Sequence, residues 1–142
     1  LYIYTMPSGG EDNYFVEHKK WAASKTNIFW HENVPHDELM QEIPSLDLIV
    51  LPSLNEMAPL VILEANSMEI PILGSNYPAI ASHITNNIDG LLFENNNAED
   101  LLQKLQTLIV KPEVIKRYSE NIVQVRSFDQ VTKEMLAIYQ KL

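Results

Sequence analysis

The most informative run in the chain is Leu46-Asp47-Leu48-Ile49-Val50-Leu51-Pro52-Ser53, which leads through Glu56 and Pro59 into an apolar segment. Residues 46–51 are mostly apolar, which is typical of a strand buried on both faces of a parallel sheet. Residues 59–68 read as a helix, because the fixed φ and missing amide hydrogen of Pro59 suit the first helical position. A strand, a loop and a helix in this order predict one repeat of a parallel α/β sheet.

The same alternation continues on both sides of this run. Turn clusters lie at residues 7–10 and 87–90. A strand and a helix recurring roughly every 20 residues predict an α/β fold, a Rossmann-like parallel sheet with helices on both faces. Such sheets bind ligands outside the carboxyl ends of their strands. The further strands are expected at residues 1–5, 27–31, 70–74 and 90–93, and the further helices at residues 11–24, 36–44, 78–85, 98–110, 112–125 and 129–142.

Length and composition indicate one globular domain. The chain has 142 residues, 46% of them hydrophobic and 20% charged. This length suffices for a self-sufficient core, and the composition excludes disordered and collagen-like classes. The absence of cysteine excludes disulfides, a thiolate zinc site and a cysteine nucleophile. No apolar run is long enough to cross a membrane and no signal sequence opens the chain, so we expect a cytoplasmic protein.

Charge is distributed unevenly along the sequence. The net charge is −9, and residues 26–103 hold twelve acidic residues and no Lys or Arg. Nucleic-acid binding needs clustered cations, so this central segment is a poor duplex-binding surface. The seven cations of residues 104–142 alternate with apolar residues at helical spacing, which is typical of solvated helix faces. We therefore expect no nucleic-acid partner.

The best candidate site follows the strand at residues 46–51. The amides of Leu60, Val61 and Ile62 should point out of the helix start without internal partners, and such an end attracts anions. The helix is apolar on every side, so it should be enclosed in the core, where the Glu64 carboxylate needs a polar partner such as a vicinal diol. Glu56 can face the same crevice. The alternative, two ordinary surface carboxylates, is equally compatible with these residues alone.

The histidines do not indicate a metal site. His18, His31, His36 and His83 belong to separate elements, and the spacing between His31 and His36 is not a strong ligand pattern. The final helix carries Val131, Met135, Ile138, Tyr139 and Leu142 on one side, so an exposed apolar strip is expected there.

The residues of the candidate site resemble a known family. Asp47 to Ser53, the pair Glu56 and Glu64, then Ala65 and Pro71, together with Asn87-Ile88-Asp89-Gly90-Leu91-Leu92-Phe93 and an aromatic at Phe128, resemble the donor-binding domain of glycosyltransferase family 4. The resemblance covers nearly the whole chain. It implies one half of a GT-B architecture, in which two Rossmann-like domains face each other across a cleft and the carboxy-terminal one binds a nucleotide-diphosphate sugar.

The resemblance also implies roles for individual residues. Glu56 would lie beside the transferred sugar as the catalytic residue, and Glu64 would hold the ribose hydroxyls. The loop at Asn33 and Val34 would border the base. Transfer in the family retains the anomeric configuration and needs no metal or other cofactor. The remaining donor-binding positions, near the diphosphate, would be Ala58, Pro59, Leu60 and Val61.

The resemblance places further parts of the enzyme outside residues 1–142. The Arg and Lys that neutralise the diphosphate in the family come from a strand and loop upstream of the position of Leu1. We therefore expect residues 1–142 to be a donor-binding domain without its first strand and helix and without the acceptor-binding N-terminal domain. Helix-end amides alone contribute about 1 kcal/mol each. The expectation is millimolar or weaker binding of nucleotide sugars and no transfer by the isolated chain.

The function expected from the resemblance is a retaining hexosyltransferase of polysaccharide biosynthesis. Its partners would be the nucleotide-sugar donor and the N-terminal domain of the full-length chain, with room for peripheral membrane association of that full-length protein. Two alternatives stay open: a non-catalytic α/β binding or regulatory module, and a sugar-nucleotide epimerase or phosphorylase of the same fold.

Overall fold

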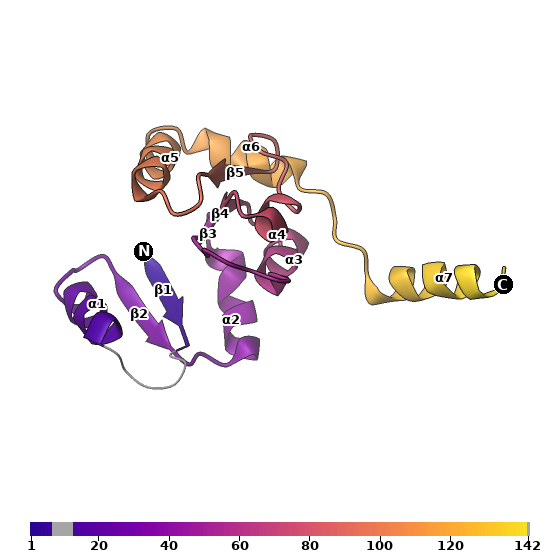
Figure 1. The fold of residues 1–142 in the computed structure, drawn as a ribbon, viewed down its shortest axis with the longest axis horizontal. Coiled ribbons are helices and arrows are strands. Elements are labelled where there is room, and N and C mark those ends of the chain that lie inside the picture. The colour runs from indigo at the N-terminus through magenta and orange to yellow at the C-terminus, as the bar shows by residue number, and fades with distance from the viewer. Residues whose placement is uncertain (7–12, 142) are drawn as a thin grey trace. The chain divides into compact units, whose positions relative to one another are not determined.

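The computed structural model describes residues 1–6 and 13–141 of the chain, which divides into two compact units, Leu1–Glu42 and Ile43–Leu142. Each unit is a parallel strand arrangement with helices packed on it (Figure 1). The turn predicted at residues 7–10 lies outside the described residues, as do the first two residues of the helix predicted at 11–24 and the last residue of the chain.

The first unit contains a two-stranded sheet. Strand β1 (Tyr2–Thr5) pairs in parallel with β2 (Phe29–Glu32), so that Tyr2 lies opposite Phe29 and Tyr4 opposite His31. Helix α1 (Asn13–Ala23) joins the strands, and α2 (His36–Glu42) follows them. Rings stack across the pair, with centroids 5.2 Å apart for Tyr2 and Phe29 and 5.0 Å for Tyr4 and His31. Because side chains alternate between faces, these four rings share one face of the sheet.

The hydroxyl of Tyr4 connects the face of the sheet that carries the stacked rings to α2. It donates a short hydrogen bond to the carboxylate of Glu42. Burial raises the pKa of Tyr4 to about 12, and the hydrogen bond and negative charge of Glu42 add to the increase. The phenol therefore stays protonated at neutral pH and keeps donating.

The second unit is built on a three-stranded parallel sheet in the order β3-β4-β5. Ile49 of β3 lies opposite Ile72 of β4, which in turn lies opposite Gly90 of β5. A single 3-10 turn at Ile43–Ser45 precedes the sheet. The elements of this unit are β3 (Ile49–Leu51), α3 (Leu60–Ser67), β4 (Ile72–Ser75), α4 (Pro78–Ala81), β5 (Gly90–Phe93), α5 (Ala98–Val110), α6 (Glu113–Asn121) and α7 (Phe128–Tyr139).

The sheet of the second unit is covered on both faces. On one face, Leu73 and Phe93 pack in a buried cluster with Leu108 of α5 and Tyr118 of α6. On the other face, Gly74 lies against α4, where an added Cβ would come within 2.6 Å of Cγ2 of Ile80. Helices α5 and α6 lie on one side of the sheet, and α3 and α4 lie on the other (Figure 1). The predicted α/β layering is confirmed within this unit.

Two predictions about burial were wrong. The strand predicted at 46–51 begins only at Ile49, and its residues are half-buried. In the described part of the second unit β3 pairs with β4 alone, and β4 is buried along its whole length. Helix α3 is not enclosed on every side. Only Ile62 and Ala65 of α3 are buried, whereas Leu60 and Leu63 are 64% and 38% exposed. In addition, the single predicted sheet is described as two sheets, one in each unit.

Helix α7 begins with a capping box. The Ser127 hydroxyl accepts from the Gln130 amide, while the Gln130 side chain accepts from the Ser127 amide. Every residue of α7 is exposed. The expected exposed apolar strip is therefore confirmed at Val131, Met135, Ile138 and Tyr139. None of the described helices has the length and apolar character needed to cross a bilayer.

Candidate functional site

The candidate site lies in the second unit, where the chain leaves β3 and enters α3. Pro59 is the N-cap residue of α3, with φ −74° and ψ 86°, and not the first helical residue as predicted. Its carbonyl accepts from the Ile62 amide at 3.0 Å, so one of the three amides expected to be unpaired has a partner. Such a tight first turn is common at helix starts. Over residues 1–6 and 13–141, the amides of Leu60 and Val61 donate to no acceptor.

Glu56 is held inside the loop that precedes α3. It is half-buried, and its Oε1 accepts from the Ser53 hydroxyl at 3.0 Å. Ser53 follows β3 by two residues, so this hydrogen bond folds the loop back toward the end of the strand. The carboxylate therefore has a defined place beside the helix start rather than on a free loop.

Glu64 lies one turn into α3. It is half-buried and stands four residues after Leu60, so the two share one face of the helix. The structure thus brings Ala58, Pro59, Leu60, Val61, Glu56 and Glu64 onto one continuous segment of the second unit.

Polar residues that the sequence did not single out connect this segment to the neighbouring strands. The Ser75 hydroxyl at the end of β4 donates to the carbonyl of Ser53 at 2.8 Å. The side-chain amide of Asn95, two residues after β5, donates to the carbonyl of Leu54 at 3.2 Å. Their position at, or just past, the carboxyl ends of parallel strands is the signal that could have identified them, since ligand sites of such sheets form there.

Asn33 and Val34 belong to the first unit and follow β2. Asn33 is exposed, has a positive φ of 51°, and donates its amide to the carbonyl of Thr5 at 3.0 Å. Val34 is half-buried. This loop belongs to the first unit, and its role in bordering the base stays a prediction.

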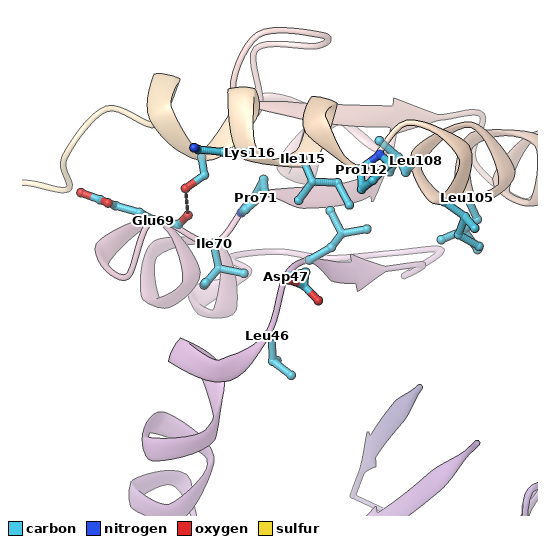
Figure 2. Close-up of a pocket in the computed structure, with 13 residues that line it drawn as sticks. Leu46, Asp47, Glu69, Ile70, Pro71, Leu105, Leu108, Pro112, Ile115 and Lys116 are labelled. Atoms are coloured by element: carbon cyan, nitrogen blue, oxygen red, sulfur yellow. Dashed lines mark hydrogen bonds between the residues drawn. The ribbon is translucent and has the colours of Figure 1, made fainter. Parts of the chain in front are cut away.

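A pocket of about 450 Å³ lies at the opposite, amino edge of the second unit's sheet (Figure 2). Its walls come from the residues before β3 and β4 and from α5 and α6, and they are mainly apolar, including Leu48, Ile70 and Ile115. The Ser119 hydroxyl closes one side by donating to the Glu69 carbonyl at 2.7 Å. Lys116 is the positively charged residue among those that line the pocket. This hollow was not predicted, and it lies away from Glu56 and Glu64.

Comparison with known proteins identifies the family of this fold. Residues 8–125 match the family described as glycosyl transferases, group 1. A relative from Escherichia coli, a UDP-Gal:alpha-D-GlcNAc-diphosphoundecaprenol alpha-1,3-galactosyltransferase, is 34% identical over 76 residues, which cover 54% of this chain and 18% of that protein. The chain spans 15% to 34% of the length of the curated relatives that it matches.

Solved structures share the fold at low sequence identity. Sucrose-phosphate synthase from Thermosynechococcus elongatus has a TM-score of 0.78 at 14% identity, covering 99% of this chain and 37% of that one. HepE from Anabaena in complex with UDP-glucose has a TM-score of 0.69 at 17% identity, covering 80% of this chain and 32% of that one. These likenesses confirm the predicted Rossmann-like α/β fold of a GT-B glycosyltransferase.

Proposed function

The chain belongs to the glycosyl transferases of group 1, and from this premise we propose that it is the donor-binding domain of a retaining hexosyltransferase. The full-length enzyme would move a sugar from a nucleotide-diphosphate sugar to an acceptor held by an N-terminal domain. Polysaccharide biosynthesis, a cytoplasmic location and catalysis without a metal or other cofactor belong to the same proposal. So does peripheral membrane association of the full-length protein.

One observation carries the proposal: two unpaired amides and two carboxylates share the segment that follows β3. The amides of Leu60 and Val61 and the positive end of α3 suit the diphosphate, because unpaired amide hydrogens and the helix dipole both favour anions. Glu64 would accept hydrogen bonds from the ribose hydroxyls. Glu56, held by Ser53, would lie beside the transferred sugar and stabilise the charge that develops at its anomeric carbon.

The names of similar proteins point to the same donor chemistry. The Escherichia coli relative is named for a UDP-galactose donor, and the Anabaena structure contains UDP-glucose. We propose a nucleotide-diphosphate sugar as the donor class for this chain. Asn33 and Val34 would border the base, and the turn at Ala58 and Pro59 would let the diphosphate approach the helix start.

The test compares carboxylate variants of the full-length enzyme. Glu56→Gln is expected to lower kcat by roughly a hundredfold, because it removes one preorganised charge from the transition state. Glu64→Gln should mainly raise KM for the donor by roughly tenfold, since a hydrogen bond to a charged group contributes on the order of 1.5 kcal/mol or more. Glu113→Gln, at an exposed acid in the first turn of α6, is the matched control and should leave both constants unchanged.

Product analysis separates the alternatives. Unchanged turnover in both site variants would refute the catalytic assignment and favour a binding module. A hexose-phosphate or an epimerised nucleotide sugar as product would indicate a phosphorylase or an epimerase.

A second test uses residues 1–142 alone. With no Lys or Arg over residues 26–103, the diphosphate would depend on helix-end amides for neutralisation. Titration calorimetry with UDP-, GDP- and ADP-sugars should therefore give dissociation constants of roughly millimolar or weaker, and no transfer. Micromolar binding would contradict this expectation.

A further inference from the structure

We propose that Ser75 and Asn95 are positioning residues that hold the loop of residues 52–59, and with it Glu56, in the arrangement that sugar transfer requires. This inference rests on the proposed function, because it assigns these residues to the same site. The two side chains come from the ends of β4 and β5, and they fix two consecutive carbonyls of the loop, those of Ser53 and Leu54.

Ser75 supplies the buried anchor. It is the last residue of β4 and fully buried, and apart from tyrosine no other polar or charged side chain in the described part of the chain is classed as buried. Its hydroxyl donates to the carbonyl of Ser53 at 2.8 Å, and the Ser53 hydroxyl donates to Glu56 Oε1 at 3.0 Å. Two hydrogen bonds therefore connect the rigid strand to the carboxylate through one residue.

Asn95 supplies the second anchor and is itself fixed. Its side-chain amide donates to the carbonyl of Leu54 at 3.2 Å, and its backbone amide donates to Oδ1 of Asn76 at 2.8 Å. The Asn76 amide in turn donates to the carbonyl of Phe93 at 2.8 Å. The loop after β3 is thus held by groups whose own positions are set by the ends of β4 and β5.

Apolar packing holds this loop only at its end, where Pro59 is buried. Leu54 is 58% exposed and Met57 is 94% exposed, so the large apolar side chains next to Glu56 contribute little burial. Between β3 and Pro59, hydrogen bonds from Ser75 and Asn95 are therefore the main restraint on the path of the chain. Since a displacement of about 1 Å at a reacting group can cost roughly a hundredfold in rate, the restraint bears on transfer and not only on folding.

The first arm of the test measures the loop itself. Ser75→Ala and Asn95→Asp are made in the full-length enzyme; the aspartate keeps the shape of asparagine and cannot donate to Leu54. Amide hydrogen exchange over residues 53–60 is expected to accelerate by roughly tenfold or more in both variants. The matched control is Ser119→Ala, which removes a similar hydroxyl-to-carbonyl bond, from Ser119 to Glu69, at the other edge of the sheet. It should leave exchange over residues 53–60 unchanged.

The second arm measures catalysis. Ser75→Ala and Asn95→Asp should lower kcat by roughly ten- to a hundredfold with little change in KM for the acceptor, while Ser119→Ala changes neither. In a Glu56→Gln background, each positioning variant should cause less than a twofold further loss, because residues acting through one group have non-additive effects. A purely structural role would give the same proportional loss in both backgrounds.

The outcomes separate this inference from the proposed function. If Glu56→Gln leaves transfer unchanged, the catalytic assignment fails whatever the exchange data show. If Glu56→Gln abolishes transfer but exchange over residues 53–60 does not change, or kcat does not fall, the positioning role is overturned. If Ser75→Ala does not fold, the partly exposed Asn95→Asp variant gives the same two readouts.

Discussion

The two units of the chain are stabilised in different ways. In the second unit, residues from β4, β5, α5 and α6 form a buried cluster around Leu73, Leu91 and Phe93, and the partly buried Val50 of β3 packs against it. In the described part of the first unit, Ala22 is the one residue classed as buried, and the sheet presents stacked rings, with Tyr2 and Phe29 51% and 49% exposed. Stability at the candidate site is therefore expected to come from the second unit.

This difference indicates how much stabilising free energy each unit can contribute to the fold. Apolar burial provides about 25 cal/mol per Å², whereas an aromatic pair adds only about 0.5–1.5 kcal/mol beyond its burial. Both tryptophans of the chain, Trp21 and Trp30, lie in the first unit. Tryptophan fluorescence therefore reports the first unit, while far-ultraviolet circular dichroism is dominated by the helices α3 to α7 of the second unit.

The largest expected effect is in the core of the second unit. Leu73→Ala should lower the free energy of unfolding by about 2–5 kcal/mol, because it opens a cavity in a fully buried position. Urea denaturation of residues 1–142 followed by circular dichroism measures the loss. Leu102→Ala, at an exposed position of α5, is the control and should change it by less than about 0.5 kcal/mol. A loss below about 1 kcal/mol for Leu73→Ala would remove the distinction between the units.

A substitution at Gly90 should give the next largest loss of stability, because the added side chain would meet backbone atoms. A Cβ added there would lie 2.7 Å from the backbone oxygen of Ile72, which cannot move without disturbing the sheet. Gly90→Ala is expected to destabilise the second unit by about 1–3 kcal/mol. Gly74→Ala is the matched comparison, since its closest contacts are side-chain atoms, Cγ2 of Ile80 at 2.6 Å and Cδ1 of Ile84 at 2.9 Å, and not backbone. Equal losses in the two variants, by thermal unfolding, would contradict the backbone argument.

The N-cap of α5 should contribute less. The Asn97 side chain accepts from the amides of Glu99 and Asp100 at 3.1 and 3.0 Å. Asn97→Ala is expected to cost about 1 kcal/mol of unfolding free energy, because these amides lose their acceptor. Asn121→Ala removes a bond from an exposed asparagine at the end of α6 and serves as control. An Asn97→Ala midpoint identical to that of the wild type in urea would refute the capping role.

The smallest effect on stability is expected for a substitution in the first unit, at Tyr4. Tyr4→Phe removes the hydrogen bond to Glu42 and should cost below about 1 kcal/mol at neutral pH, since both groups are partly exposed. The pKa of Tyr4 is about 12 in the folded chain and near 10 when unfolded. The folded state thus binds the proton more tightly, so this contribution is complete below pH 10 and is lost as the pH rises toward 12.

Tryptophan fluorescence during urea denaturation at pH 8 and pH 11 measures this change. The difference between wild type and Tyr4→Phe should shrink at the higher pH. A difference that grows with pH would show that the phenolate, and not the phenol, is favoured in the folded first unit.

Local patterns in the sequence predicted most elements because helices and strands depend on nearby residues. The predicted helix at 98–110 has those bounds in α5, and the predicted strand at 90–93 has those of β5. The predicted ends of α6 and β3 were less accurate. The helix predicted at 112–125 stops at Asn121, and the strand predicted at 46–51 starts at Ile49. Apolar spacing marks the middle of an element better than its ends, because helix and strand ends fray.

The candidate site was predicted in part. Glu56, Glu64 and the start of α3 are close together in the sequence. The sequence alone therefore predicted that they belong to one segment. Ser75 and Asn95 contact residues 22 and 41 positions away, and such contacts depend on how neighbouring strands align. The alternation of apolar residues does not specify that alignment.

Covalent order and side-chain chemistry fixed the run of strands and helices, the anionic middle of the chain and the two carboxylates beside a helix start, because each depends on neighbours along the backbone. Tertiary packing made β4, and not β3, the fully buried strand, and it brought Ser75 and Asn95 to the loop that carries Glu56. These features arise from contacts between distant residues, whose geometry is set only when the strands pack side by side.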